Sequence, residues 1–339
     1  MHNRKRASGQ DELPGSRQAE SQNRRLAEPR NRRQAESRNR RQAGSRNRRK
    51  TGPLALFAIT CLLSGLFIGL FLLGNYGLSV SRYDLSVTGL PASFSGTRIV
   101  QISDLHNASF GAGNERLLER IDALKPDLIL VTGDLISSGD TDFSPALALM
   151  TGLAARYTTC LSLGNHEQIH RWLAEEMHPT FLEKIEALGI HILDNSRMEW
   201  KRGDAFVDIF GYTSDLTYYS GADVLSSSGI SRSDPAPLLE KLGAPRKAIT
   251  LLMAHNPDYL ESYASWGADV VFSGHLHGGV VRLPFAGGIL SPSREWFPHF
   301  DAGLFRQGET IMVVNRGLGN SIIPVRIFNP PDISMITLH

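Results

Sequence analysis

Cysteine is almost absent from this sequence, whose 339 residues include only two, Cys61 and Cys160. Both fall within apolar runs and act as small apolar fillers, which excludes a disulfide-stapled scaffold and a structural zinc site of the cysteine type. No P-loop or glycine-rich dinucleotide fingerprint occurs either, so no nucleotide cofactor is expected. The chain does contain a hydrophobic share of 41%, which is enough for one large domain with additional segments.

Basic residues are scarce after the first fifty positions. Residues 1–50 contain 16 Lys and Arg against 5 Asp and Glu, whereas the remaining 289 contain 20 against 29. The tail repeats Asn-Arg-Arg every eight residues, at 23, 31, 39 and 47, and has almost nothing apolar to bury. We therefore predict a disordered Arg-rich tail over residues 1–52. It could contact anionic membrane lipids, remain solvated without a partner or, least favoured, bind nucleic acid.

The longest uncharged run is Leu54–Leu73, twenty residues that are rich in Leu, Phe and Ile. A helix of about this length crosses the ~30 Å hydrocarbon core of a bilayer. A cleaved signal peptide is disfavoured because the run is long and no Ala-x-Ala follows it, and Arg48-Arg49 matches a twin-arginine export signal poorly. The sequence therefore predicts an uncleaved transmembrane anchor over residues 53–75.

The charges that flank this run predict its orientation. Residues 34–53 contain seven Lys and Arg, whereas residues 75–94 contain only Arg82. Positive flanks stay in the cytoplasm. We therefore expect a single-pass protein with a cytoplasmic N-terminus and an extracytoplasmic domain.

Strand and helix patterns alternate from Arg98 onward, which is typical of an α/β domain with sheets covered by helices. Helices are predicted over Asn114–Leu124, from Ser144, and along a stretch ending near Leu188. Strands are predicted at Arg98–Ser103, Leu128–Thr132, Thr158–Leu163, Ile190–Leu193, Ala248–Ala254, Asp269–Phe272, Ile311–Asn315 and Ile333–Leu338, with a hairpin over Glu199–Gly211. We expect one domain over residues 97–339, preceded by a linker over 76–96.

Polar side chains of metal-ligand type follow five of these strands. They occur in Asp-Leu-His, Gly-Asp, Gly-Asn-His-Glu, a single His, and Gly-His-Leu-His, and the candidate ligands are Asp104, His106, Asp134, Asn165, His255, His275 and His277. Ligands of open α/β sheets bind beyond the carboxyl ends of the strands, so these side chains can converge at one edge. The set of carboxylate, amide and imidazole groups suits Mn, Fe or Zn ions.

Each candidate also has an ordinary structural interpretation. Asp104 and Asp134 could cap helices, Asn165 could occupy a turn, and His255 could be a loop residue. The functional interpretation is favoured because all five motifs occur together, each at a strand end.

The five motifs in this order resemble the calcineurin-like metallophosphoesterase family, and the resemblance covers about Thr97 to Leu338. Ser103-Asp104-Leu105-His106, with Arg316-Gly317-Leu318-Gly319 and Asn329-Pro330-Pro331, is further similar to its membrane-anchored bacterial subgroup, which includes enzymes similar to UDP-2,3-diacylglucosamine pyrophosphatases. One departure is Ser137, where many members have an acidic residue.

This resemblance implies a four-layer αββα sandwich and two divalent metal ions in one site. One ion would take Asp104, His106, Asp134 and His277, and the other would take Asp134, Asn165, His255 and His275. His166 would act as a catalytic group that stabilises or protonates the leaving oxygen. The implied activity is hydrolysis of a phosphoester, phosphodiester or pyrophosphate bond by metal-activated hydroxide.

The substrate is only loosely indicated. Residues 284–305 follow the Gly-His-Leu-His turn and, together with Arg294 and Arg306, hold five aromatic side chains: Phe285, Trp296, Phe297, Phe300 and Phe305. They could form a wall for a lipid-linked or other bulky phosphate, or an ordinary packed loop. A small-molecule or lipid phosphate is the expected partner of the site, and an inactive binding or scaffold module on the same fold is the alternative function.

Overall fold

The structure is a computed structural model that describes residues 52–173, 181–220, 229, 231–246, 248–283, 285–292, 295–320 and 325–339. The predicted Arg-rich tail therefore lies outside the described residues, apart from residue 52. The chain separates into two compact units, residues 1–63 and 64–339. The described part of the first unit belongs to helix α2 (Pro53–Tyr76), which continues into the second.

Helix α2 contains no charged residue in its 24 positions, and its large apolar side chains are mostly exposed. It is the one helix in the described part of the chain that is long and apolar enough to cross a membrane. The predicted anchor is thus a continuous apolar helix.

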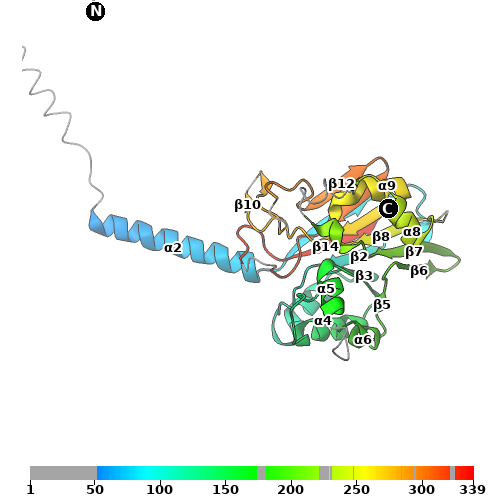
Figure 1. The fold of residues 1–339 in the computed structure, drawn as a ribbon. Coiled ribbons are helices and arrows are strands. Elements are labelled where there is room, and N and C mark those ends of the chain that lie inside the picture. Colours follow the sequence, from blue (N-terminus) through cyan, green and yellow to red (C-terminus); the bar gives the residue numbers. More distant parts are fainter. Residues whose placement is uncertain are drawn as a thin grey trace, which may run out of the picture. The chain divides into compact units, whose positions relative to one another are not determined.

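Two six-stranded sheets form the centre of the second unit (Figure 1). The first sheet has the order β1 (Ser79–Leu85), β14 (Asp332–Leu338), β2 (Arg98–Ile102), β3 (Leu128–Thr132), β4 (Thr159–Ser162) and β5 (His191–Ile192). The second has the order β12 (Gly303–Gln307), β13 (Thr310–Val314), β9 (Val270–Ser273), β8 (Thr250–Ala254), β7 (Ala205–Tyr212) and β6 (Ser196–Arg202). A separate short hairpin pairs β10 (Arg282–Leu283) with β11 (Gly287–Gly288).

Helices cover the outer faces of both sheets. The first sheet packs against α3 (Glu115–Asp122), α4 (Ser144–Ala154) and α6 (Phe181–Glu186), and the second against α8 (Ala236–Leu242) and α9 (Leu260–Trp266). A third apolar cluster lies between the sheets, with Leu128 and Leu130 from the first and Leu251 and Phe272 from the second. These layers confirm the expected αββα sandwich. Helix α5 (Asn165–Leu173) and four short 3-10 turns (Ala92–Phe94, Ala112–Asn114, Leu216–Tyr219 and Pro257–Tyr259) complete the described elements.

The central strands β2, β3 and β4 pair in parallel, as do β7, β8 and β9. Strands β3, β4, β8 and β9 are buried along their whole length, which explains why they read as short continuous apolar runs in the sequence. Parallel pairing brings the carboxyl ends of neighbouring strands to the same edge. The fold therefore places the polar strand ends side by side.

Strand β1 was not predicted, because residues 76–96 were expected to be a linker. Residues 79–85 instead pair in parallel with β14 at the edge of the first sheet. Its sequence, Ser-Val-Ser-Arg-Tyr-Asp-Leu, buries fully only the last residue. An edge strand keeps one side free of sheet partners and tolerates polar residues, so it lacks the apolar pattern on which the sequence prediction depends.

Candidate active site

The seven predicted metal ligands follow five strands that neighbour one another in two groups. Strands β2, β3 and β4 are adjacent in the first sheet, and β8 and β9 are adjacent in the second. Six of the seven side chains are buried, and the seventh, Asn165, is half-buried at the start of α5. Charged and imidazole groups are seldom buried without a partner, so this concentration indicates a site.

Hydrogen bonds join the two sheets where these side chains meet. Nδ1 of His255, after β8, lies 2.6 Å from the main-chain oxygen of Thr132 at the end of β3. The main-chain N–H of His275 donates to Oδ1 of Asp104 at 3.0 Å. The ligand-bearing turns of one sheet are thus held directly against those of the other.

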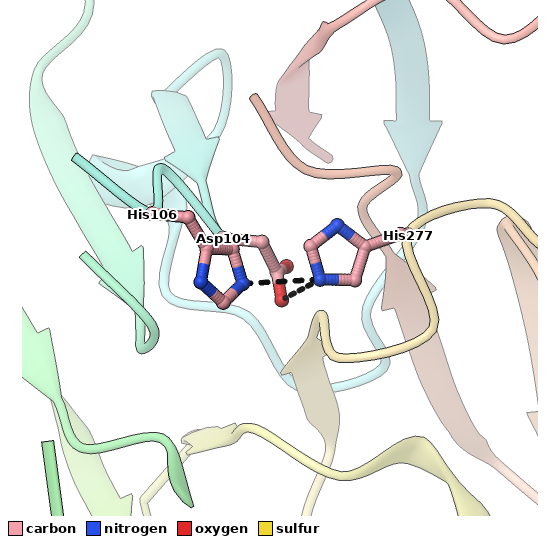
Figure 2. A group of neighbouring side chains, drawn as sticks. All are labelled: Asp104, His106 and His277. Atoms are coloured by element: carbon pink, nitrogen blue, oxygen red, sulfur yellow. Dashed lines mark hydrogen bonds and ion pairs between the residues drawn. The ribbon is translucent and has the colours of Figure 1, made fainter. Parts of the chain in front are cut away.

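Figure 2 shows the first group of candidate ligands, Asp104, His106 and His277. Nε2 of His277 lies 3.4 Å from Oδ1 of Asp104 and 3.1 Å from Nε2 of His106. Their ligand atoms lie within 4.8 Å of one another. Two imidazole nitrogens and a carboxylate oxygen that converge in this way form a suitable partial coordination shell for a divalent cation.

Asp134, His255 and His275 form a second such group, also buried. Asp134 reaches toward both groups, since its Oδ2 lies 3.0 Å from Nε2 of His255 and 3.8 Å from Nε2 of His106. One carboxylate therefore stands between two sets of imidazole ligands. A third group joins His106, Asp134 and His166.

A buried polar atom supports the interpretation of these groups as a metal centre. Oδ1 of Asn165 has no hydrogen-bond partner among the described residues. An unsatisfied buried polar atom is costly unless something else binds it. An amide oxygen is an ordinary metal-ligand atom, so the residues present fit divalent ions.

The backbone at these positions is unusual as well. Five of the seven candidates have positive φ values between 44° and 70°: Asp104, His106, Asp134, His275 and His277. Residues other than glycine seldom adopt this region. Such strain persists where the surrounding structure fixes it, and it clusters at functional sites.

Glycines make the tight approach of these turns possible. A Cβ atom added to Gly164 would collide with the side chain of Asp134, and one added to Gly274 would collide with the side chains of Ser103 and Asp104. The Gly-Asn-His-Glu and Gly-His-Leu-His motifs therefore need glycine for close packing around the carboxylates.

The hydrogen bonds of two histidines assign them opposite tautomers. The Thr132 carbonyl can only accept, so Nδ1 of His255 carries a proton. The main-chain N–H of Ser138 can only donate, and it lies 2.9 Å from Nδ1 of His166. Neutral His166 therefore carries its proton on Nε2, which suits a proton donor and not a metal ligand.

Burial keeps most imidazoles of the site neutral. It lowers the pKa of His106 and of His275 to about 3, and that of His277 well below its usual value. Burial opposes the charge on His255 too, but the nearby carboxylates of Asp134 and Asp104 raise its pKa to about 10. Neutral imidazole is the form that binds metal.

Glu167 has a role that sequence reasoning did not assign, although it belongs to the Gly-Asn-His-Glu motif. Its buried carboxylate accepts hydrogen bonds from the main-chain N–H groups of Asp134, Leu135 and Gly164 at 2.8, 2.6 and 2.9 Å. Burial raises the pKa of Glu167 to about 7. Glu167 thus fixes the turns that carry Asp134 and Asn165.

Two further residues support histidine ligands from behind. Oγ of Ser137 lies 3.2 Å from Nδ1 of His106, so the position that departs from the family pattern still contacts a candidate ligand. Arg326 is buried, and its guanidinium lies 3.3 Å from Nδ1 of His277 and donates to the main-chain oxygen of Arg316 at 3.0 Å. Second partners of this kind orient metal ligands. A lone arginine among apolar residues was the available signal for Arg326.

The aromatic segment after the Gly-His-Leu-His turn divides into two sets. Phe300 and Phe305 pack on the outer core of the second sheet, as an ordinary packed loop would. Phe285, Trp296 and Phe297 are exposed. Residues 284, 293 and 294, which include Arg294, lie outside the described residues. The sequence analysis did not identify Tyr219, whose ring packs against that of His275 with ring centroids 5.0 Å apart.

The sequence profile described as "Calcineurin-like phosphoesterase" matches residues 97–279, more than half of the chain. The chain belongs to this family. It is 26% identical to the uncharacterized metallophosphoesterase YkuE of Bacillus subtilis, over 77% of this chain and 85% of that protein. It is 27% identical to the UDP-2,3-diacylglucosamine pyrophosphatase LpxG of Chlamydia muridarum, over 76% and 88%, and 28% identical to the phosphodiesterase YaeI of Escherichia coli, over 71% and 82%.

Family membership and the Asp and His groups together identify a metal-dependent hydrolase that acts on phosphoester bonds. All seven candidate ligands, from Asp104 to His277, lie within the matched residues.

Proposed function

We propose that this protein is a membrane-anchored, dinuclear-metal phosphohydrolase that cleaves a phosphodiester or pyrophosphate bond in a lipid-linked substrate. The observation that carries the proposal is the position of Asp134 between two groups of imidazoles, 3.0 Å from His255 and 3.8 Å from His106. A single carboxylate shared by two ligand sets suits two ions in one site.

Two ions would divide the ligands between them. One would be held by Asp104, His106, Asp134 and His277, and the other by Asp134, Asn165, His255 and His275. When bound, such ions supply charge that polarises the phosphoryl oxygens and lowers the pKa of water. Mn, Fe and Zn all fit this set of oxygen and nitrogen donors.

His166 donates a proton to the leaving oxygen. The N–H of Ser138 occupies its Nδ1, so its Nε2 proton is the one available to a substrate. The main-chain N–H of His166 donates to Oδ1 of Asp134 at 2.9 Å. This bond holds His166 next to the carboxylate that the two imidazole groups share.

The substrate class is inferred from two directions. The name of one relative, a UDP-2,3-diacylglucosamine pyrophosphatase, suggests a substrate that bears acyl chains. The name of another, a phosphodiesterase, suggests a phosphate that joins two organic groups. The apolar α2 suits an enzyme that works at a bilayer. The charge bias of the sequence around α2 favours an extracytoplasmic active site.

The test uses the full-length protein in detergent. Metal is removed with a chelator and Mn²⁺ is added back, while hydrolysis of bis(p-nitrophenyl) phosphate is followed by absorbance. We expect activity to vanish on chelation, to return with Mn²⁺, and to be lost in His275→Ala. His191→Ala, at an exposed position on β5, is the matched control. Hydrolysis that ignores both chelation and His275→Ala rejects the proposal.

The alternative is a binding or scaffold module on the same fold. It predicts purified protein with almost no metal and no hydrolysis after Mn²⁺ is added. The orphaned Asn165 oxygen favours the enzyme, because a scaffold has no use for an unsatisfied buried amide.

A further inference from the structure

A pocket lies beside the end of helix α2, within residues 64–339. It has a volume of about 620 Å³, inside the range of about 300–1,000 Å³ that is usual for small-molecule sites. Its walls are apolar apart from Arg282 and Ser79, and its large apolar lining residues are Leu70, Leu73, Leu78, Leu283 and Phe328. Leu70 and Leu73 belong to the long apolar helix, so this pocket continues the surface that would face a bilayer.

The charged residue of the pocket lining, Arg282, contacts the turn that carries a candidate metal ligand. Arg282 donates to the main-chain oxygen of Gly278 at 2.9 Å and pairs with Asp301 at 2.9 Å. Gly278 directly follows the candidate ligand His277. A ligand with an apolar chain in the pocket would therefore have its polar end near the candidate metal centre.

A short chain of contacts links the same helix end to that centre. The side chain of Asn75 accepts from the main-chain N–H of Arg326 at 3.0 Å and donates to its oxygen at 3.1 Å. The other end of Arg326 lies 3.3 Å from His277. One arginine side chain separates the end of the apolar helix from a metal ligand.

Three exposed phenylalanines in the neighbouring loops have strained backbones. Phe285, Phe297 and Phe328 have φ values of 69°, 52° and 52°, and Phe297 and Phe328 are 60% and 46% exposed. Bulky residues rarely adopt this region, and packing in the core does not account for rings that are exposed. Aromatic side chains commonly lie at the level of lipid headgroups, so a bilayer surface would cover them.

We propose that this pocket, defined by Leu70, Leu73, Leu78, Arg282, Leu283 and Phe328, binds an acyl chain of a membrane-lipid substrate while the phosphate of that lipid enters the metal centre. The proposal rests on the proposed phosphohydrolase function. The occupant is an acyl chain because the pocket is apolar, includes residues of the membrane-type helix and has as its one cation Arg282, which is bonded to the turn after the candidate ligand His277.

The test compares two chromogenic diesters that share a leaving group. Full-length protein in phosphatidylcholine nanodiscs is given Mn²⁺ and either hexadecyl or methyl p-nitrophenyl phosphate. Hydrolysis of either ester breaks the bond from phosphorus to nitrophenolate, so only the alkyl chain differs. We expect kcat/KM to be at least about tenfold higher for the hexadecyl ester, since burial of methylene groups stabilises the bound chain.

Two variants then test whether the alkyl chain of the ester occupies the pocket. Leu283→Trp fills the pocket, and Phe328→Asn removes an apolar wall while asparagine tolerates positive φ. Each should reduce the preference for the hexadecyl ester at least about threefold. Leu239→Trp on α8, at a leucine that is 45% exposed against 44% for Leu283, is the matched control. An equal rate for both esters in the wild type, or a preference that survives both pocket variants, overturns the pocket.

A second measurement does not depend on turnover. Nanodiscs that contain phosphatidylglycerol with a diazirine on its acyl chain are irradiated, and modified peptides are mapped by mass spectrometry. Labels on residues 282–283 or 328–330 support the pocket even if neither ester is hydrolysed. Absence of hydrolysis together with such labels would reject the phosphohydrolase function and leave the pocket supported. Labels restricted to residues 53–69 of α2, outside the pocket lining, overturn the pocket and leave the phosphohydrolase function intact.

Discussion

The carboxylate of Glu167 accepts a hydrogen bond from the main-chain N–H of Asp134 at 2.8 Å. The same side chain accepts from Gly164 at 2.9 Å, so one buried anion joins the turns after β3 and β4. Asp134 is the carboxylate that lies between the two imidazole groups. Its position therefore depends on a residue that does not itself face the site.

Replacement of Glu167 by glutamine should destabilise the fold and weaken metal binding together. Glutamine keeps the shape, but its amide nitrogen would meet main-chain N–H donors and leave at least one of them unsatisfied. We expect a loss of about 2–4 kcal/mol in the free energy of unfolding, measured by urea denaturation, and a lower metal content. Glu240→Gln, at an exposed position on α8, should change stability by less than about 0.5 kcal/mol. Unaltered stability of the Glu167 variant would contradict this role.

Replacement of His166 by glutamine should lower turnover without loss of metal. The expected decrease in kcat is about 10²–10⁴-fold, the usual contribution of general acid–base catalysis. Metal content by atomic emission should match the wild type, because the Nε2 proton of His166 disfavours a ligand role. A parallel loss of metal would instead assign His166 to the group that it forms with His106 and Asp134.

The alternation of strand and helix patterns predicted an α/β domain, the family resemblance implied its αββα layers, and local motifs at the strand ends indicated the candidate ligands. Buried parallel strands read as apolar runs, and each ligand follows one of them directly. Strand β1 was missed because edge strands need little apolar pattern. Glu167, Ser137 and Arg326 were not assigned because their roles arise from contacts across the fold, between residues 31 to 49 positions apart. No local pattern specifies such contacts.

Metal uptake at pH 8 should release at least about one proton per protein. Asp134 and Asp104 outweigh the effect of burial and hold the pKa of His255 near 10, so its imidazole is charged before metal binds. The other three histidine ligands are already neutral at this pH, because burial lowers their pKa values. Calorimetric titration with Mn²⁺ in two buffers of different ionisation enthalpy measures the number released. A value near zero would contradict a protonated His255.

The same shift affects the stability of the metal-free protein. The folded pKa of His255 lies above its usual value of 6.5, so protonation favours the folded state. This contribution is fully present below pH 6.5 and is lost as the pH rises through about 10. Denaturation midpoints of chelated protein should therefore fall between pH 7 and pH 10, and those of metal-loaded protein should fall less.

The last prediction concerns the side of the membrane on which the active site lies. Seven Lys and Arg precede α2 within residues 34–53, whereas one follows within residues 75–94. This bias should retain the N-terminus in the cytoplasm, and each tail cation near anionic lipids adds about 1 kcal/mol of attraction. Alkaline phosphatase fused after His339 should then be active in intact bacterial cells, while a fluorescent protein fused there should be dark.

A charge variant makes this test specific to the flank. Exchange of the seven basic residues in 34–53 for glutamine should yield a mixture of both membrane orientations, since it removes the charge bias that holds the N-terminus in the cytoplasm. Both the phosphatase fusion and the fluorescent fusion should then be partly active. An inactive phosphatase fusion with a bright fluorescent fusion in the unmodified chain would contradict the extracytoplasmic site. A cytoplasmic site would have access to nucleotide-linked lipid precursors, as the name of the pyrophosphatase relative suggests, whereas an external one meets lipid and envelope phosphates. The orientation thus determines which lipid phosphates are tried first as substrates.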